Sequence, residues 1–374
     1  MDDSRAGRLL AAFIVTGLFF LALPGTFIGV GNLLLIAASR APTAPAPAWI
    51  QAHGQAQVFG WVGSFMFGIS LFILPRFRGI ALASLAWGWT MWALWTAGVA
   101  LHWLGGVGDM PAHPWLVVSA VLELAAFIIS QYLLVVAPAR AARAGSGTLR
   151  VRPAGAARDL GTRLGMAGFC GLGLTLVVNL VAAIQVAPES AAYPPVLDHI
   201  LLELSLWTFL LPIALGYSSR FVSMFLGLRP LHGTQVWQRG LRGFDLNRLL
   251  MLMVAALAIA ILLQAWPAAA ALALVFAATT VWALRIFEPP ARPALLGGVY
   301  GGYAWFVRIA FVWLLIGAVI GLMASADPAR SGLAGAGRHA LTVGYIATLI
   351  FTMAPRLLPE FLHRRLASRA LMAG

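Results

Sequence analysis

Residues 302–323 read GYAWFVRIAFVWLLIGAVIGLM, and Arg308 is the one charged residue among them. An α-helix rises about 1.5 Å per residue, so about 20 apolar residues match the roughly 30 Å hydrocarbon core of a bilayer. Lipid offers no hydrogen-bond partners, and a helix satisfies its backbone polar groups internally. This segment therefore predicts a membrane-spanning helix.

The rest of the chain repeats this pattern. Of its 374 residues 61% are hydrophobic and 10% are charged, with a mean hydropathy of +0.89, which no water-exposed globular surface would tolerate. We expect an all-α polytopic bundle in a lipid bilayer, with the first span kept as an uncleaved anchor. The ten expected spans are 9–36, 53–75, 79–103, 114–137, 163–187, 196–218, 248–265, 267–287, 302–323 and 339–358.

The charge distribution predicts an orientation. All 25 basic residues are Arg. With the N-terminus inside, only Arg40, Arg330 and Arg338 fall on the outer side and Arg308 falls within a span, so the positive-inside rule places both termini in the cytoplasm of a bacterial-type inner membrane. The net charge of +13 follows the membrane and is not a nucleic-acid signature. The single cysteine, Cys170, excludes an intramolecular disulfide and an all-Cys metal site.

Polar stretches suggest how the chain is divided. We treat 1–374 as a single membrane domain, with helices 1–4 in 1–137, a flexible cytoplasmic linker at 138–162, and helices 5–10 in 163–374. A second polar stretch, 219–247, contains Phe221 and Phe225 beside Arg220, which indicates a short interfacial helix or a plain loop.

Five of the seven histidines fall on the predicted outer side. We expect four of them to open helices and one, His102, to close helix 3. A helix N-terminus disfavours imidazolium and keeps the ring neutral, which is the form that binds a metal or haem iron. An interfacial histidine without a ligand role is the alternative at each position. The four that open helices are His53, His113, His199 and His339.

Ionisable residues within spans are the second signal, because a charge at the bilayer centre costs about 2.5–3.5 kcal/mol even on lenient scales. Glu123 lies midway along helix 4. Glu203 follows His199 by one helical turn. It either orients the His199 ring, or binds a metal together with His199, or is a neutral hydrogen-bonded carboxyl. Arg308 either needs a partner in the bundle or extends to the interface as an anchor.

Two motifs resemble the NnrS family of haem- and copper-containing membrane proteins. GYAW at 302–305 and HALTVG at 339–344 resemble its C-terminal signature, and HGQAQVFG at 53–60 is similar to its first motif, His-x-His-Glu-Met-Leu-Phe-Gly. The second His of that motif is Gln55 here and the Glu is Ala56. Arg220 matches the family's Arg before a Pro-Phe pair, with Ser223 in place of the Pro.

The resemblance implies a role in resistance to nitric oxide or nitrosative stress, linked to denitrification, and a bundle of ten or, as the family is usually drawn, twelve spans. It implies haem b and copper as cofactors, with the copper site altered by Gln55 and Ala56, and nitric oxide and a respiratory electron donor as partners. His53 and His339 are the expected axial ligands. His199 with Glu203 is the expected second metal or haem site, with His102 and His113 behind it.

Two other functions fit the sequence. A secondary transporter or channel would line its pathway with Glu123, Glu203 and Arg308. A cofactor-free assembly factor of a respiratory complex would use neither set of residues. The sequence does not decide whether the protein is an enzyme.

Overall fold

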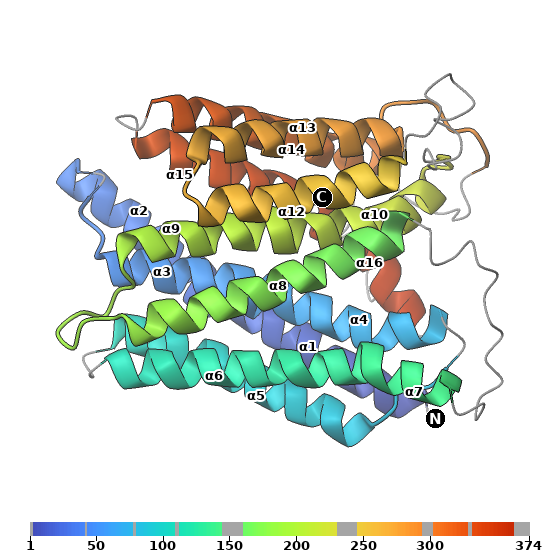
Figure 1. The fold of residues 1–374 in the computed structure, drawn as a ribbon, viewed down its shortest axis with the longest axis horizontal. Coiled ribbons are helices and arrows are strands. Elements are labelled where there is room, and N and C mark those ends of the chain that lie inside the picture. Colours follow the sequence, from blue (N-terminus) through green and yellow to red (C-terminus); the bar gives the residue numbers. More distant parts are fainter. Residues whose placement is uncertain are drawn as a thin grey trace. The chain divides into compact units, whose positions relative to one another are not determined.

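The computed structural model describes residues 3–41, 43–77, 80–108, 112–143, 160–229, 245–293, 302–327 and 331–362. Every regular element in these ranges is a helix, so the prediction of an all-α bundle is confirmed (Figure 1). Within these described ranges, eight helices are long and apolar enough to cross a membrane: Ser4–Ser39, Pro47–Arg76, His113–Arg140, Leu160–Ile184, Pro195–Phe225, Trp266–Leu284, Tyr303–Ala326 and Gly332–Pro359.

Two of the ten expected spans are not among these eight. The helix α12 (Leu246–Leu262) is apolar but has only 17 residues. The helix α5 (Leu85–Val107) has 23 residues, but its tryptophans, glycines and His102 make it less apolar than the others. Both are helices at the predicted places.

Several spans contain a π-helical segment, in which the backbone hydrogen bonds reach one residue further than in an α-helix. Such segments are rare and frequently occur at functional sites. They join shorter α-helices into continuous rods: α1 (Asp3–Phe20), η1 (Leu21–Phe27) and α2 (Ile28–Ser39); α3 (Pro47–Gln55), η2 (Ala56–Gly63) and α4 (Ser64–Phe77); α6 (Ala112–Gln131), η3 (Tyr132–Val136) and α7 (Ala137–Arg143); α9 (Pro195–Leu204), η5 (Ser205–Leu210) and α10 (Leu211–Phe225); α15 (Ser331–His339), η6 (Ala340–Ala347) and α16 (Thr348–Leu362).

The chain forms two compact units. The first comprises Met1–Pro153 and Gly173–Leu202, and the second comprises Ala154–Leu172 and Glu203–Gly374. The helix α8 (Leu160–Ile184) therefore contributes to both. The predicted linker begins later than expected, because helix α7 continues to Arg143, and 144–159 lies outside the described residues.

In the first unit, aromatic side chains fill notches left by glycines. A Cβ atom at Gly60 would lie 2.7 Å from Phe20, and one at Gly68 would lie 2.7 Å from Phe13, so the first span packs closely on η2 and α4. Trp95 of α5 is fully buried, and its indole N–H donates to the Phe59 carbonyl at 3.2 Å. Helices α5 and α6 run side by side (Figure 1).

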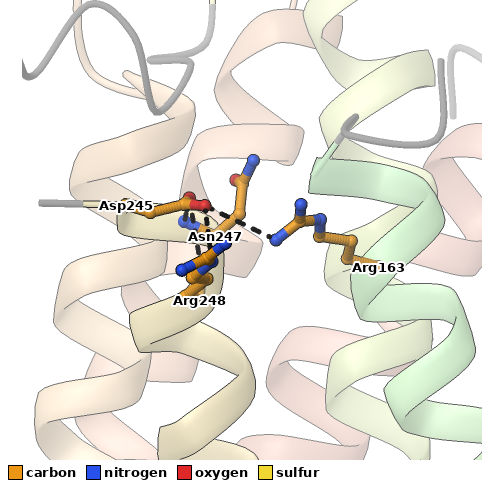
Figure 2. A network of polar contacts seen from close by, with 4 residues as sticks. All are labelled: Arg163, Asp245, Asn247 and Arg248. Atoms are coloured by element: carbon orange, nitrogen blue, oxygen red, sulfur yellow. Dashed lines mark hydrogen bonds and ion pairs between the residues drawn. The ribbon is translucent and has the colours of Figure 1, made fainter. Parts of the chain in front are cut away.

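In the second unit, Asp245 caps the N-terminus of helix α12 and forms ion pairs with two arginines (Figure 2). Asp245 Oδ1 accepts from the backbone N–H groups of Asn247 at 3.0 Å and Arg248 at 3.4 Å. Its Oδ2 lies 3.3 Å from Arg248 Nε and 3.8 Å from Nη1 of Arg163 on α8. This cap satisfies two backbone donors that the first turn of a helix leaves unpaired.

The stretch after Ser219 corrects one expectation. Phe221 and Phe225 are part of α10, and both are at least nine-tenths buried within this structure. The rod is longer than hydropathy suggested, so no separate interfacial helix begins there. Residues 230–244 lie outside the described part of the chain.

The helices that carry His53 and His339 also begin earlier than expected. Pro47 occupies the first turn of α3, and α15 starts at Ser331, so His339 is the last residue of α15 and does not open a helix. The small residues of 331–337 lower the hydropathy but allow α15 to pack closely, since a Cβ atom at Gly337 would lie 3.3 Å from the Gly321 backbone of α14 (Tyr303–Ala326). The argument from helix N-termini therefore does not apply to these two histidines.

Candidate functional site: a buried carboxyl network and the histidines near it

The centre of the first unit is a buried carboxyl group, Glu123 on α6, whose side chain is fully buried. Its Oε1 accepts from Gln55 Nε2 of α3 at 2.8 Å, and its Oε2 accepts from Asn179 Nδ2 of α8 at 2.9 Å. No ion pair among the described residues involves Glu123. The carboxyl is therefore held by two neutral amides that come from two other helices.

A series of hydrogen bonds connects this carboxyl to a histidine. Tyr193, in the connection between α8 and α9, donates its hydroxyl hydrogen to Asn179 Oδ1 at 2.8 Å. The Tyr193 oxygen lies 3.3 Å from Nδ1 of His102, and the two rings meet edge to face with their centroids 5.3 Å apart. Since the phenol already donates to Asn179, it accepts from His102 Nδ1–H.

Tyr193 is fixed as a donor by its surroundings. Its backbone N–H donates to Gln51 Oε1 at 2.7 Å, and Gln51 Nε2 donates back to the Tyr193 carbonyl at 3.3 Å. Burial, followed by the negative charges of Glu123 and Asp198, raises the pKa of the Tyr193 phenol well above its usual value. The hydroxyl therefore stays protonated and keeps the Asn179 amide in one orientation.

Close packing of α5 on α6 makes room for Glu123. A Cβ atom at Gly98 would lie 2.8 Å from Glu123 Cγ, so only glycine fits at this position without a shift. Ser119, one turn before Glu123, donates to the Gly98 carbonyl at 2.7 Å. The carboxyl is thus enclosed by backbone on one side and amides on the other.

His53 lies against the first span in the same unit. Its Nδ1 is 2.7 Å from the Gly25 carbonyl oxygen, and because a carbonyl only accepts, Nδ1 carries the hydrogen. A Cβ atom at Gly29 would lie 2.7 Å from Cε1 of the ring, so the imidazole rests on the bare backbone there. This arrangement fixes the tautomer whose Nε2 has the lone pair, as in most metal-binding histidines.

His339 in the second unit has the same tautomer. Its Nδ1 donates to the Gly335 carbonyl at 2.9 Å, and its side chain is exposed on this chain. His199 is half-buried on α9, in the rod that continues into η5. His113 differs, because its Nε2 is the atom that bonds, to the Ile184 carbonyl at 3.4 Å.

The remaining predicted residues are engaged in helix packing. Glu203 Oε1 lies 3.4 Å from Nε of Arg338, so the last turn of α9 is tied to α15 next to His339. Arg308 donates to the carbonyls of Ile286 at 3.2 Å and Glu288 at 3.4 Å, beyond the end of α13 (Trp266–Leu284). Arg220 Nη2 donates to Thr162 Oγ1 at 2.6 Å.

Sequence reasoning missed two members of the network, Asn179 and Tyr193. Asn179 could have been found, since it is an amide within the last two turns of the apolar helix α8, where a polar side chain costs free energy unless it is paired. Tyr193 lies in the connection between α8 and α9, and no sequence pattern marks it as a functional residue. Gln55 was noted only as a departure from a family motif, whereas it is a direct partner of Glu123.

The donor set limits the metal chemistry. No group of three or more His, Cys, Asp and Glu side chains that could hold a metal ion occurs in the part of the chain that the structure describes. A haem iron needs only one or two protein ligands, and a single imidazole with a fixed tautomer suits that requirement. Among the described residues, an imidazole whose Nδ1–H donates to a backbone carbonyl fits a haem iron.

The helices and this interior define a multi-pass helical membrane protein with a buried carboxyl network. Comparison with models of known protein families finds no match to this chain, and comparison with curated proteins finds none either.

Proposed function

We propose that this chain is a haem-binding membrane protein of the NnrS type, involved in nitric oxide resistance or denitrification-linked redox chemistry. The observation that carries the proposal is the shared tautomer of His53 and His339. In both, Nδ1–H donates to a backbone carbonyl. Both also lie at the end of an α-helix just before a π-helical segment.

Each of these two histidines would be a ligand of b-type haem, and His199 would be a further ligand. When bound, such a haem would supply an iron that can bind nitric oxide or transfer electrons. The protein's own contribution is orientation: the Gly25 and Gly335 carbonyls hold the imidazoles in the ligating tautomer. Copper is the less supported cofactor, because Gln55 bonds to Glu123.

In this proposal the protein lies in a bacterial-type inner membrane with both termini in the cytoplasm, and its partners would be nitric oxide and a respiratory electron donor. The distribution of the 25 arginines supports the orientation. The test is the reduced-minus-oxidised visible spectrum of the protein purified in detergent, followed by metal analysis and a nitric oxide titration. A b-type spectrum that shifts with nitric oxide is expected. A colourless preparation that takes up no added haemin would contradict the proposal.

The second candidate is a secondary transporter, and one observation favours it: a fully buried carboxyl on a membrane-spanning helix. Buried ionisable groups in such helices often mark a substrate or proton pathway. The other two residues expected on the pathway, Glu203 and Arg308, bond to Arg338 and to backbone carbonyls. Proton-driven uptake into vesicles that is lost in Glu123→Gln, from a haem-free protein, would favour this candidate.

A further inference from the structure

The two amides that hold Glu123 are not equivalent. Asn179 uses both ends of its amide: Oδ1 accepts from Tyr193 and Nδ2 donates to Glu123. Turning it over would break both bonds. Gln55 donates from Nε2 to Glu123, and its amide oxygen has no hydrogen bond within the described part of the chain. Gln55 can therefore rotate its amide by half a turn without losing another partner.

This difference bears on the two states of the carboxyl. An ionised carboxyl only accepts, and it receives hydrogen bonds from both amides. A neutral carboxyl has one O–H to donate, and it needs an acceptor. With Gln55 turned, Glu123 Oε1–H donates to the Gln55 oxygen while Oε2 still accepts from Asn179. Both states then keep two hydrogen bonds, which matters because an unsatisfied buried polar group costs about 1–3 kcal/mol.

We propose that Glu123 is a reversible proton-binding site in the interior of the first unit, with Gln55 as the amide that adapts to its protonation state and Asn179 as the amide that does not. One proton from hydronium in the solution adds to Oε1 of Glu123 and leaves a water molecule, and the only other bonds that change are the hydrogen bonds of Gln55. This inference rests neither on haem binding nor on transport.

The charged and titratable groups around Glu123 are few. The hydrogen-bond network that includes Glu123 contains two other titratable groups, His102 on α5 and Tyr193 in the connection after α8, and the charge of Asp198 at the start of α9 acts on Tyr193. The Tyr193 hydroxyl stays protonated, and Asp198 has the same charge as ionised Glu123. Among the described residues, no arginine contacts the carboxyl to hold it permanently ionised.

The first test is infrared difference spectroscopy of the purified protein between alkaline and acidic pH. A carboxylic acid C=O band should grow on acidification in the wild type, disappear in Glu123→Gln and persist in Glu189→Gln. Glu189 is the matched control because it is exposed in the connection between α8 and α9. An identical difference spectrum in the wild type and Glu123→Gln would overturn the proposal.

The second test compares the two amides by the pH midpoint of that band. Asn179→Leu removes a donor that is worth more to the ionised form, so the midpoint should rise, by about one pH unit. Gln55→Leu removes a partner of both forms, so its midpoint should move by less than half as much. Equal shifts in the two variants would overturn the distinct role of Gln55, and size-exclusion profiles matching the wild type confirm that the variants are folded.

Discussion

Gln55 Nε2 lies 2.8 Å from Glu123 Oε1, and this hydrogen bond joins α3 to α6 across 68 residues of sequence. In the sequence motif that residues 53–60 resemble, the second histidine corresponds to Gln55, and in this structure Gln55 is part of a buried carboxyl network.

Loss of either amide should destabilise the first unit. Asn179→Leu leaves a buried carboxyl oxygen and the Tyr193 hydroxyl without their partner, at a cost of about 1–3 kcal/mol per unsatisfied group. The melting temperature in detergent should fall. Gln185→Ala, an exposed amide after α8, is the control and should leave the melting temperature unchanged. Equal melting temperatures for both variants would contradict the account.

Gly98→Ala should destabilise by overpacking. Its new Cβ atom would lie 2.8 Å from Glu123 Cγ and 3.0 Å from the Ser119 carbonyl oxygen, so α5 and α6 must separate. We expect a loss of about 1–3 kcal/mol. Gly31→Ala meets nothing within 4 Å and should be neutral or slightly stabilising, since alanine favours helices over glycine. A melting temperature for Gly98→Ala at or above that of Gly31→Ala would be inconsistent with the close packing.

Asp245 should act mainly as a helix cap. Asp245→Ala removes the cap of α12 and should cost about 0.5–2 kcal/mol. Asp245→Asn keeps an effective cap and loses only the ion pairs with Arg163 and Arg248, which are partly exposed and worth about 0–1 kcal/mol. In denaturation experiments the free energy of unfolding of Asp245→Asn should therefore be close to that of the wild type, and that of Asp245→Ala should be lower. If Asp245→Asn lost as much stability as Asp245→Ala, the ion pairs would be the source of the stabilisation.

Much of the architecture could be predicted from the sequence, because hydropathy reports directly on lipid exposure. All ten expected spans are helical, and the errors are in their end points. For example, small residues lower the hydropathy of 331–338, so the predicted span begins at 339 although the helix begins at Ser331. The network could not be predicted. It brings together residues that are 68 and 56 positions apart, and helix packing decides their contacts. The π-helical segments have no sequence pattern that we could have used.

Gly29→Ala tests whether haem binding depends on the position of the His53 ring, without removing the imidazole. The added Cβ atom would lie 2.7 Å from Cε1 of the ring, so it should displace the ring and weaken its bond to the Gly25 carbonyl. Haem bound per protein should fall severalfold while helical circular dichroism is retained. Gly31→Ala, two residues away and without neighbours within 4 Å, should keep its haem. Full haem content in Gly29→Ala would argue against His53 as a ligand.

The most direct test of the proposed function is the haem content of His53→Ala and His339→Ala, measured as the pyridine haemochrome per purified protein. His113→Ala is the matched control, because its Nε2 is hydrogen-bonded to a backbone carbonyl. We predict that both ligand variants insert into the membrane but lose the b-type absorbance, and that His113→Ala retains it. Wild-type haem content in His53→Ala and His339→Ala would contradict the assignment of these two histidines.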